Sequence, residues 1–200
     1  MGQPAHGGLL DGWLEHVIAT PGLTSLQDPA EARRVLLDDA LRGVPLVAAV
    51  DGRVVDVGSG GGTPGIPLAV SLPEREVTLL EAERRKCRFL ERWTHELPNL
   101  RVLWGRAEEQ PLEQYGVAVA KALAEPVVAA EWCLPLVAAG GRVVLWVGPS
   151  AEPERVARAA ERVGGELVES PPGFLVLAKS GPTPAGFPRR PGIARKRPLA

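Results

Sequence analysis

The residues that most constrain the fold run from Val54 to Leu68, with the sequence VVDVGSGGGTPGIPL. Three of the first four are β-branched valines, which predicts a short buried strand at 54–57. Five glycines follow within eight residues, and glycine lets a backbone turn sharply and approach a ligand closely. Thr63 and Pro64 then predict a helix start, with the threonine as its cap. A strand, a glycine loop and a helix N-terminus together form a pocket for an anionic ligand group.

Two cofactors are bound by loops of this kind. Residues 60–65 fit the dinucleotide fingerprint G-x-G-x-x-G, which alone is a weak signal. Residues 56–62, DVGSGGG, resemble motif I of the methyltransferases that use S-adenosylmethionine (SAM), in which an acid precedes the first glycine. Pro64 and Pro67 also disfavour the smooth helix of a dinucleotide site. We therefore favour SAM over NAD, and over a glycine-rich turn that binds no ligand.

The composition indicates one globular domain with a sizeable core. The chain has 200 residues, of which 45% are hydrophobic and 24% are charged. Cys87 and Cys133 are far apart, which predicts reduced thiols and neither a disulfide nor a metal site. Apolar runs are shorter than the roughly 20 residues that span a membrane, and the N-terminus lacks a signal pattern. We expect a soluble, cytoplasmic protein with no membrane partner.

Charge is distributed unevenly along the chain. The formal net charge is −1, but residues 181–200 contain five basic side chains and no acid, which leaves 18 basic and 24 acidic residues in the first 180. Prolines interleave these cations, and a stiff basic segment suits phosphate binding. We predict that this tail binds RNA, the alternative being a solvated tail that aids solubility. Its basic residues are Arg189, Arg190, Arg195, Lys196 and Arg197.

Apolar periodicity predicts strands that alternate with helices, and therefore an α/β fold with a mostly parallel sheet. The last two strands are joined by so short a turn that they must be antiparallel. We expect an N-terminal helical cover (1–50, with residues 1–8 loose), a ligand-binding domain (51–180) and the tail (181–200). The expected helices are 9–19, 28–42, 64–72, 83–97, 126–137 and 153–163. The expected strands are 54–57, 76–81, 101–104, 117–121, 142–147, 166–170 and 174–179.

Polar residues follow several of the expected strands, at the edge where parallel sheets bind ligands. Glu81 follows the second strand, and its carboxylate can accept both hydroxyls of a ribose. Ala107 and Glu108 follow the third strand and can receive an adenine amino group. Lys121 ends the fourth strand and can bind a carboxylate or a phosphate. The alternatives are a solvated strand-end charge for Glu81, a helix cap for Glu108 and a surface lysine for Lys121.

Four runs in collinear order make the resemblance specific: DVGSGGGTPGIPLA, VTLLEAERRKCRFLER, WGRAEE and PTPAGFPRRPGIARKRPL. Over residues 23–199 the chain resembles the bacterial 16S rRNA guanine-N7 methyltransferases, the RsmG or glucose-inhibited division protein B family. The resemblance implies a class I SAM-methyltransferase (Rossmann-like) fold, SAM as cofactor, and 16S rRNA or the 30S subunit as partner. The predicted cofactor-binding residues are Gly58, Gly60, Gly62, Thr63, Glu81, Ala107, Glu108 and Lys121.

The chain departs from the family pattern at several positions, and the asparagine-leucine-threonine segment near the N-terminus survives only as Gly22-Leu23-Thr24. Lys121 stands where members usually have arginine, and Trp146-Val147 stand where they usually have a lysine-glycine pair. Gly173-Phe174 replace an arginine-histidine pair. Two further readings therefore stay open: a non-catalytic RNA-binding or scaffold protein on the same fold, and a SAM methyltransferase with another acceptor. The Trp146 side chain, at the end of an expected strand, could either pack in the core or stack on the target base.

The reaction implied by the resemblance needs no catalytic base. Guanine N7 has a free lone pair and no proton to lose, so positioning and electrostatics can supply most of the rate. Residues 122–126, ALAEP, replace the Asn/Asp-Pro-Pro-aromatic run that amino-group methyltransferases usually carry. Neither cysteine follows an expected strand, which disfavours a cysteine adduct. We therefore predict no catalytic side chain and no metal.

Overall fold

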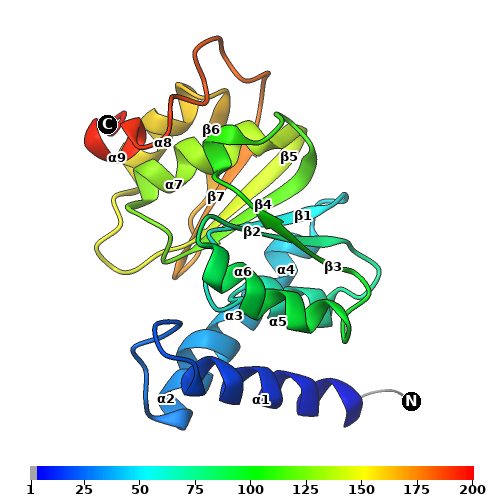
Figure 1. The fold of residues 1–200 in the computed structure, drawn as a ribbon. Coiled ribbons are helices and arrows are strands. Elements are labelled where there is room, and N and C mark those ends of the chain that lie inside the picture. Colours follow the sequence, from blue (N-terminus) through cyan, green and yellow to red (C-terminus); the bar gives the residue numbers. More distant parts are fainter. Residues whose placement is uncertain (1–3) are drawn as a thin grey trace.

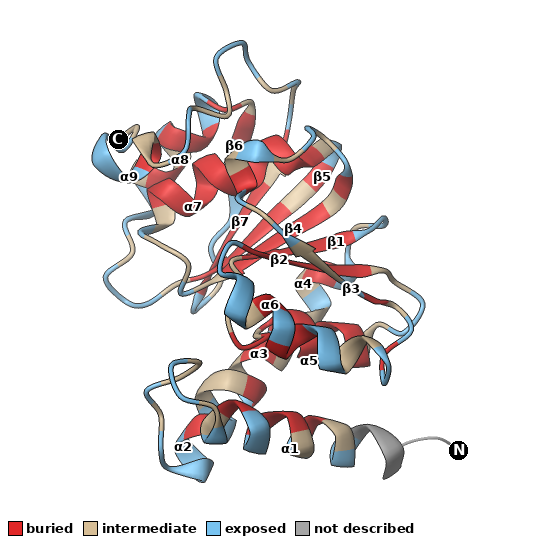
Figure 2. Cartoon of the chain, in the orientation of Figure 1, coloured by how far each residue is buried: buried red, intermediate tan, exposed pale blue. Residues whose placement is uncertain are grey.

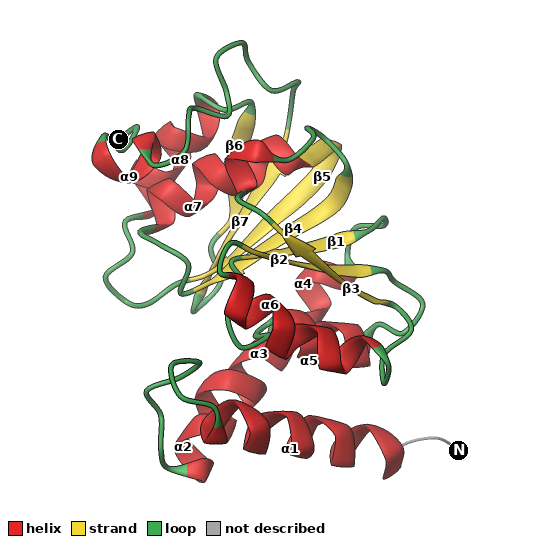
Figure 3. Ribbon diagram, viewed as in Figure 1, coloured by secondary structure: helices red, strands yellow, loops and turns green. Residues whose placement is uncertain are grey.

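The computed structural model describes residues 4–200 and contains one seven-stranded sheet in the order β3-β2-β1-β4-β5-β7-β6 (Figures 1 and 3). Strands β1 to β5 pair in parallel, whereas β7 pairs antiparallel with both β5 and β6. The predicted α/β fold with an antiparallel C-terminal pair is confirmed. The strands are β1 (Val54–Val57), β2 (Val77–Glu81), β3 (Leu100–Trp104), β4 (Tyr115–Lys121), β5 (Val137–Trp146), β6 (Gly165–Glu169) and β7 (Phe174–Lys179).

Helices pack on both faces of this sheet (Figure 1). The α-helices are α1 (Pro4–Ala19), α2 (Pro29–Ala32), α3 (Asp39–Leu41), α4 (Val44–Ala48), α5 (Gly65–Ser71), α6 (Arg84–Leu90), α7 (Pro126–Cys133), α8 (Pro153–Glu161) and α9 (Ile193–Lys196). A π-helical segment, η1 (Arg33–Asp38), joins α2 to α3. Short 3₁₀ segments are η2 (Glu91–Thr94), η3 (Ala107–Glu109) and η4 (Leu134–Leu136).

Successive residues of the central strands point into two separate hydrophobic cores, because side chains alternate across a sheet. Val55 and Val57 pack in a core with α7 and α8, whereas Val54 packs in a second core with α1, α5 and α6. All four residues of β1 are buried, as are most residues of the central strands, whereas the edge strands β3 and β6 are partly exposed (Figure 2). The sheet therefore forms the middle of three layers, and its strand ends are fixed from both sides.

Several boundaries differ from the prediction: the expected helix 83–97 is α-helical only to Leu90, the expected helix 126–137 ends at Cys133, and strand β5 begins at Val137 rather than at residue 142. Helix α1 begins at Pro4 rather than at residue 9, so the described part of the segment 1–8 is helical; residues 1–3 lie outside the described residues. Trp13 is fully buried and anchors this helix, which can extend through glycines because each added residue contributes one more hydrogen bond. Helix α4 was not predicted because five largely apolar residues show no helical period.

The C-terminal segment is folded onto the domain and is not a free tail. Helix α9 lies beside α7, and Ala194 within it is 2% exposed (Figure 1). Phe187 and Leu199 pack against the core that α7 and α8 share. The sequence missed this helix because it is only four residues long and follows a proline-rich stretch. Apolar side chains between the prolines, Phe187 and Ala194, pack into the core and fix the path of the segment over the surface.

Candidate cofactor crevice

A crevice of about 580 Å³ lies at the carboxyl ends of the parallel strands. It opens beside β1 and β4, where the strand order changes direction, and parallel sheets bind ligands at such points. Its walls come from the glycine loop, from the ends of β2, β3 and β4, and from both terminal regions of the chain. Among the predicted cofactor residues, Gly58, Gly60, Thr63, Glu81, Ala107, Glu108 and Lys121 line it.

The glycine loop takes a conformation that other residues would resist. Gly58, Gly60 and Gly62 have φ angles of +74°, +57° and +102°. A Cβ at Gly58 would also come 2.3 Å from Leu123 Cδ1, across the crevice from β1. A Cβ at Gly62 would instead meet Ile66 Cδ1 at 2.5 Å, on the core side of the loop. Gly62 therefore packs against the core on the inner side of the loop, whereas Gly58 and Gly60 form the crevice surface.

The helix that follows the loop is capped by a residue that we did not predict. Thr63 was expected to cap it, but the Thr63 hydroxyl donates to Leu36 O at 2.7 Å and so joins the loop to the N-terminal helices. The N–H of Gly65, the first residue of α5, donates to Asp56 Oδ2 at 3.0 Å. The acid that precedes the glycines thus accepts from the first N–H of helix α5 and holds the helix N-terminus in place.

Asp56 is 1% exposed, and this burial changes its titration. Desolvation, with a smaller contribution from the charge of Glu81, raises the pKa of the Asp56 carboxyl from 3.8 to about 7, although hydrogen bonds from Gly65 N and Ser59 lower it. The other carboxyl oxygen, Oδ1, is buried and has no hydrogen-bond partner among residues 4–200. Asp56 therefore organises the loop from inside the protein.

Glu81 is the last residue of β2 and lies beside the glycine loop, as the sequence predicts. Its Oε2 accepts from Gly60 N at 2.9 Å, and its Oε1 accepts from Glu83 N at 2.7 Å. The side chain is fixed by these bonds and the residue is 7% exposed. A carboxylate oxygen can accept more than one hydrogen bond, so both oxygens keep capacity for ligand hydroxyls.

Lys121 binds the N-terminal helical region across the crevice mouth. Its Nζ lies 2.6 Å from Asp39 Oδ2, with both side chains partly buried. The Trp146 indole N–H donates to Asp39 O at 2.9 Å, and its ring packs edge-on against Phe174 at 5.1 Å. Trp146 is 8% exposed and belongs to the core. The hypothesis that Trp146 stacks on a target base is therefore wrong, and core packing is its role.

The C-terminal segment contributes to the crevice as well. Gly192 and Arg195 line it, and Gly192 N–H donates to Glu108 Oε1 at 3.3 Å. Among the five predicted RNA-binding cations, Arg190, Arg195, Lys196 and Arg197 are exposed. Arg189 is instead paired with Glu131 of α7 at 2.5 Å. The sequence contained one signal for this pair: Glu131 is the single charge in the apolar helix PVVAAEWC.

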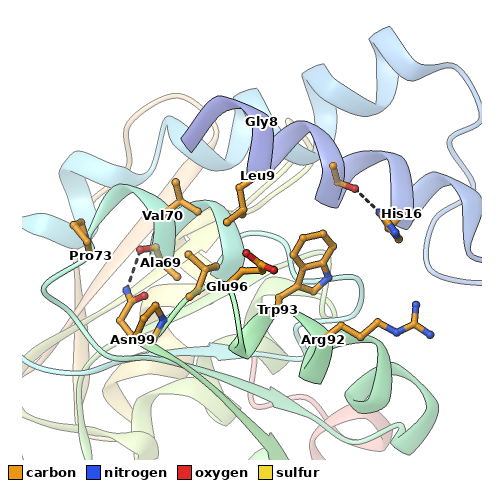
Figure 4. Close-up of a pocket in the computed structure, with 13 residues that line it drawn as sticks. Gly8, Leu9, His16, Ala69, Val70, Pro73, Arg92, Trp93, Glu96 and Asn99 are labelled. Carbon is orange, nitrogen blue, oxygen red and sulfur yellow. Dashed lines mark hydrogen bonds between the residues drawn. The ribbon is translucent and has the colours of Figure 1, made fainter. Parts of the chain in front are cut away.

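A second, larger cavity of about 950 Å³ lies between α1, the end of α5 and η2 (Figure 4). Asn99, which lines it, donates its amide to the carbonyls of Ala69, Leu72 and Arg75 at 2.9, 3.2 and 3.0 Å. This amide is thus used to tie chain segments together. Asn99 directly precedes β3, so the cavity lies at the amino edge of the sheet, opposite the edge where parallel sheets bind ligands. We therefore assign the ligand site to the crevice.

The structure gives little support for a reactive cysteine or for a metal site. Burial raises the pKa of both cysteine thiols, and Cys133 is fully buried. Cys87 Sγ donates to Glu81 O at 3.3 Å, within the protein interior. Among residues 7–200, whose side chains the structure describes, no cluster of three or more His, Cys, Asp or Glu side chains could hold a metal ion. In the same residues, no helix is long and apolar enough to cross a membrane.

The strand order, the glycine loop and the acid at the end of β2 define a class of protein: the fold is that of the class I SAM-dependent methyltransferases. A sequence model described as rRNA small subunit methyltransferase G matches residues 13–168. The chain belongs to this family. It is 37% identical to "Ribosomal RNA small subunit methyltransferase G" of Synechococcus elongatus, covering 88% of this chain and 82% of that one.

Further comparisons agree with this assignment. The protein of the same name from Symbiobacterium thermophilum is 36% identical over 97% of this chain and 87% of that one. Among solved structures, the T. thermophilus 16S rRNA N2 G1207 methyltransferase RsmC, in complex with AdoMet and guanosine, superposes with a TM-score of 0.54. That alignment covers 76% of this chain and 41% of that one at 18% identity, so it bears on the fold alone.

Proposed function

We propose that this chain binds SAM in the crevice and transfers its methyl group to guanine N7 in 16S rRNA, in the cytoplasm. The observation that carries the proposal is the buried Glu81 carboxylate held against the N–H of Gly60. An acid placed one strand away from a glycine loop is suited to accept the hydroxyls of a nucleoside ribose. The rRNA acceptor follows from family membership.

The crevice residues fit the parts of SAM. Gly58 and Gly60 present bare backbone, so a ligand can approach the loop closely. Glu81 would hold the ribose, and Ala107 with Glu108 would receive the adenine. Lys121 would bind the methionine carboxylate, because its ammonium has three donors and the bond to Asp39 uses one of them. Gly62 and Asp56 would shape the loop without touching the ligand.

Bound SAM would supply an electrophilic methyl group on a sulfonium. The protein then has to hold guanine so that the N7 lone pair faces that methyl, and no proton needs to leave N7. Ala122 and Leu123 follow β4 and line the crevice, and neither side chain is a base, which agrees with this requirement. Orientation within the crevice is therefore the main contribution of the chain to the rate.

Exposed cations line the crevice and lie on helix α6, whose Lys86 also lines it, and they would bind the rRNA backbone. Arg195 and Arg106 line the crevice and are exposed, as are Arg84 and Arg88 on α6. Trp104 ends β3 with 57% exposure, and the Arg84 guanidinium lies 4.7 Å from its ring centroid. An exposed aromatic ring among cations can stack on an unpaired base while the cations bind phosphates. The surface thus suits single-stranded or looped RNA.

We propose a division of labour that follows the three segments. Residues 51–180 would bind the methyl donor, and 1–50 would cover the crevice from one side through Thr63 and Lys121. Residues 181–200 would bring cations to the RNA. The partner would be 16S rRNA, either free or within the 30S subunit, and a comparison of the two as substrates distinguishes these forms.

Two measurements test the proposed function. Calorimetric titration with SAM should give saturable binding, whereas a scaffold that has lost the cofactor would release no heat. Mapping of N7-methylguanosine in rRNA from cells with and without the gene should show one modified position that disappears. A protein that binds SAM but leaves rRNA methylation unchanged on deletion would have another acceptor.

A further inference from the structure

One ion pair fastens the C-terminal segment, residues 189–197, to the body of the domain. The guanidinium of Arg189 donates from Nε to Glu131 Oε1 at 2.6 Å and from Nη2 to Glu131 Oε2 at 2.5 Å. This two-pronged geometry is the strongest form of an arginine–carboxylate contact. The Glu131 side chain is 1% exposed, so this charge lies in the core and depends on its partner.

The same guanidinium also closes the segment on itself. Arg189 Nη2 donates to Arg197 O at 2.9 Å, which joins the two ends of the C-terminal segment. Ala194, between them, is buried against the core. The segment is thus held at both ends and in the middle, and its position relative to α7 is fixed.

The held segment forms one side of the crevice. Gly192 N–H donates to Glu108 Oε1, and Arg195 Nη2 donates to Leu123 O at 3.2 Å. The Arg195 guanidinium also lies 5.2 Å from the ring centroid of Trp132, the residue next to Glu131. Each of these three contacts is made to a residue that lines the crevice. Gly192 has a φ of +82°, a conformation that suits glycine at this turn.

We infer that Arg189 is a positioning residue for the methyl-donor site: by clamping Glu131, it holds the C-terminal segment as a wall of the crevice. This inference rests on the proposed binding of SAM in that crevice and gives Arg189 a task other than RNA contact. Loss of the clamp frees Gly192 and Arg195 to move away from Glu108 and Leu123. A methyl donor would then bind a crevice whose C-terminal side is loose. Ordering that side on binding costs free energy, so the affinity for the donor would be lower.

Bound SAM should in turn stabilise the C-terminal segment. A donor that contacts Glu108 favours the arrangement in which Glu108 accepts from Gly192 N–H, so SAM should slow hydrogen exchange of the amides in 189–197. A wall that has no contact with the donor would exchange at the same rate with and without SAM.

The main test compares the SAM affinity of two variants and the parent by calorimetry. Arg189→Ala should weaken SAM binding about ten-fold, whereas Arg190→Ala should stay within about two-fold of the parent. Arg190 is the matched control because it is the adjacent exposed cation, and its side chain makes no hydrogen bond or ion pair with the described residues. Equal SAM affinity in Arg189→Ala and the parent would overturn the inference.

A second variant separates a lost wall from simple destabilisation. Arg189→Ala leaves Glu131 as an unpaired buried charge, whereas Glu131→Gln combined with Arg189→Ala removes that charge too. The double variant should regain part of the lost thermal stability but still bind SAM weakly. Recovery of both properties would show that the unpaired carboxylate, rather than the loosened segment, had lowered the affinity.

Steady-state kinetics give the remaining readout. With saturating rRNA, Arg189→Ala should raise the KM for SAM about ten-fold and leave kcat at saturating SAM within about three-fold of the parent. An unchanged KM with a reduced kcat would contradict a positioning role at the donor site. If the parent itself fails to bind SAM, the proposed function fails instead, so the two failures are distinguishable.

Discussion

Glu81 Oε2 accepts a hydrogen bond of 2.9 Å from Gly60 N, and this bond joins the end of β2 to the glycine loop after β1. The contact fixes a carboxylate at the crevice surface before any ligand arrives. A preorganised acceptor loses little freedom on binding, so its hydrogen bonds contribute more to affinity. The same bond makes Glu81 the most direct point at which to test the ligand site.

Glu81→Gln should weaken SAM binding about ten-fold, equivalent to ~1.4 kcal/mol. Glutamine keeps the size of the side chain but replaces one acceptor by a donor, which cannot receive a ribose hydroxyl proton. Calorimetric titration with SAM measures this effect, and rRNA affinity serves as a control that should stay unchanged. Parent-like SAM affinity would mean that other residues hold the ribose.

Lys121→Met should also weaken SAM binding about ten-fold, because the methionine carboxylate loses its cation. Asp39 keeps a partner in this variant, since Arg42 Nη1 lies 2.8 Å from Asp39 Oδ1. Arg42→Met is the matched control, as it removes the other cation on Asp39 from outside the crevice and should leave SAM affinity unchanged. Lys121→Arg, which restores the residue typical of the resembling sequences, should bind SAM at least as well as the parent. Equal losses in Lys121→Met and Arg42→Met would assign Lys121 to stability alone.

Asp56 should make the free energy of unfolding depend on pH in a known direction. Its carboxyl pKa is about 7 in the folded chain against 3.8 ordinarily, so between these values the folded chain holds a proton that the unfolded chain has lost. The contribution of this group to the free energy of unfolding is therefore fully present below about pH 4 and is lost as pH rises to about 7. At ~1.4 kcal/mol per pKa unit, the loss between about pH 5 and about pH 8 is roughly 2–3 kcal/mol.

Urea unfolding of the parent and of Asp56→Asn at these two pH values measures that loss. Asparagine keeps an oxygen that can accept from Gly65 N but does not titrate, so the variant should lose less stability between the two values. Glu83 and Glu113 have lowered pKa values, so the stability that they contribute increases with pH and is opposite in sign to the contribution of Asp56. Identical slopes in parent and variant would show that Asp56 is ionised in the folded protein.

Trp104→Ala should weaken rRNA binding by about ten-fold, within the ~1–3 kcal/mol that stacking of one base contributes. Because Trp104 is 57% exposed, the variant should lose little thermal stability and no SAM affinity. Leu112→Ala is the control, since Leu112 is also an exposed large apolar residue, at 39%, and belongs to neither crevice nor basic surface. Filter binding to a 16S rRNA fragment at fixed salt compares the three proteins. Similar losses for Trp104→Ala and Leu112→Ala would remove the stacking role.

Local chemistry made much of the fold and of the site predictable. Strand 54–57 and the turn at 171–173 follow from valine runs and from proline and glycine, which act within a few residues. Glu81 was predictable because the carboxyl ends of parallel strands meet at one edge. The sequence therefore located most of the crevice from neighbours along the chain and from sheet geometry.

The remainder depended on partners that are distant in sequence. Thr63 has the residue type of a helix cap, yet its hydroxyl bonds Leu36, 27 residues away, and Asp56 caps the helix instead. Arg189 has the residue type of a phosphate ligand, yet it pairs with Glu131, 58 residues away. Residue type tells which bonds a side chain can make, but packing decides which neighbour lies within reach.

The wall formed by Gly192 and Arg195 has a consequence for the timing of activity during synthesis. The glycine loop at 58–62 leaves the ribosome long before these residues, and chains grow at about 5–20 residues per second. A nascent chain therefore carries an unfinished donor site for much of its translation. Chains in which helix α9 has not yet been made and docked would bind the methyl donor more weakly, so that partly synthesised protein would be less active beside the ribosomal RNA on which the folded enzyme acts.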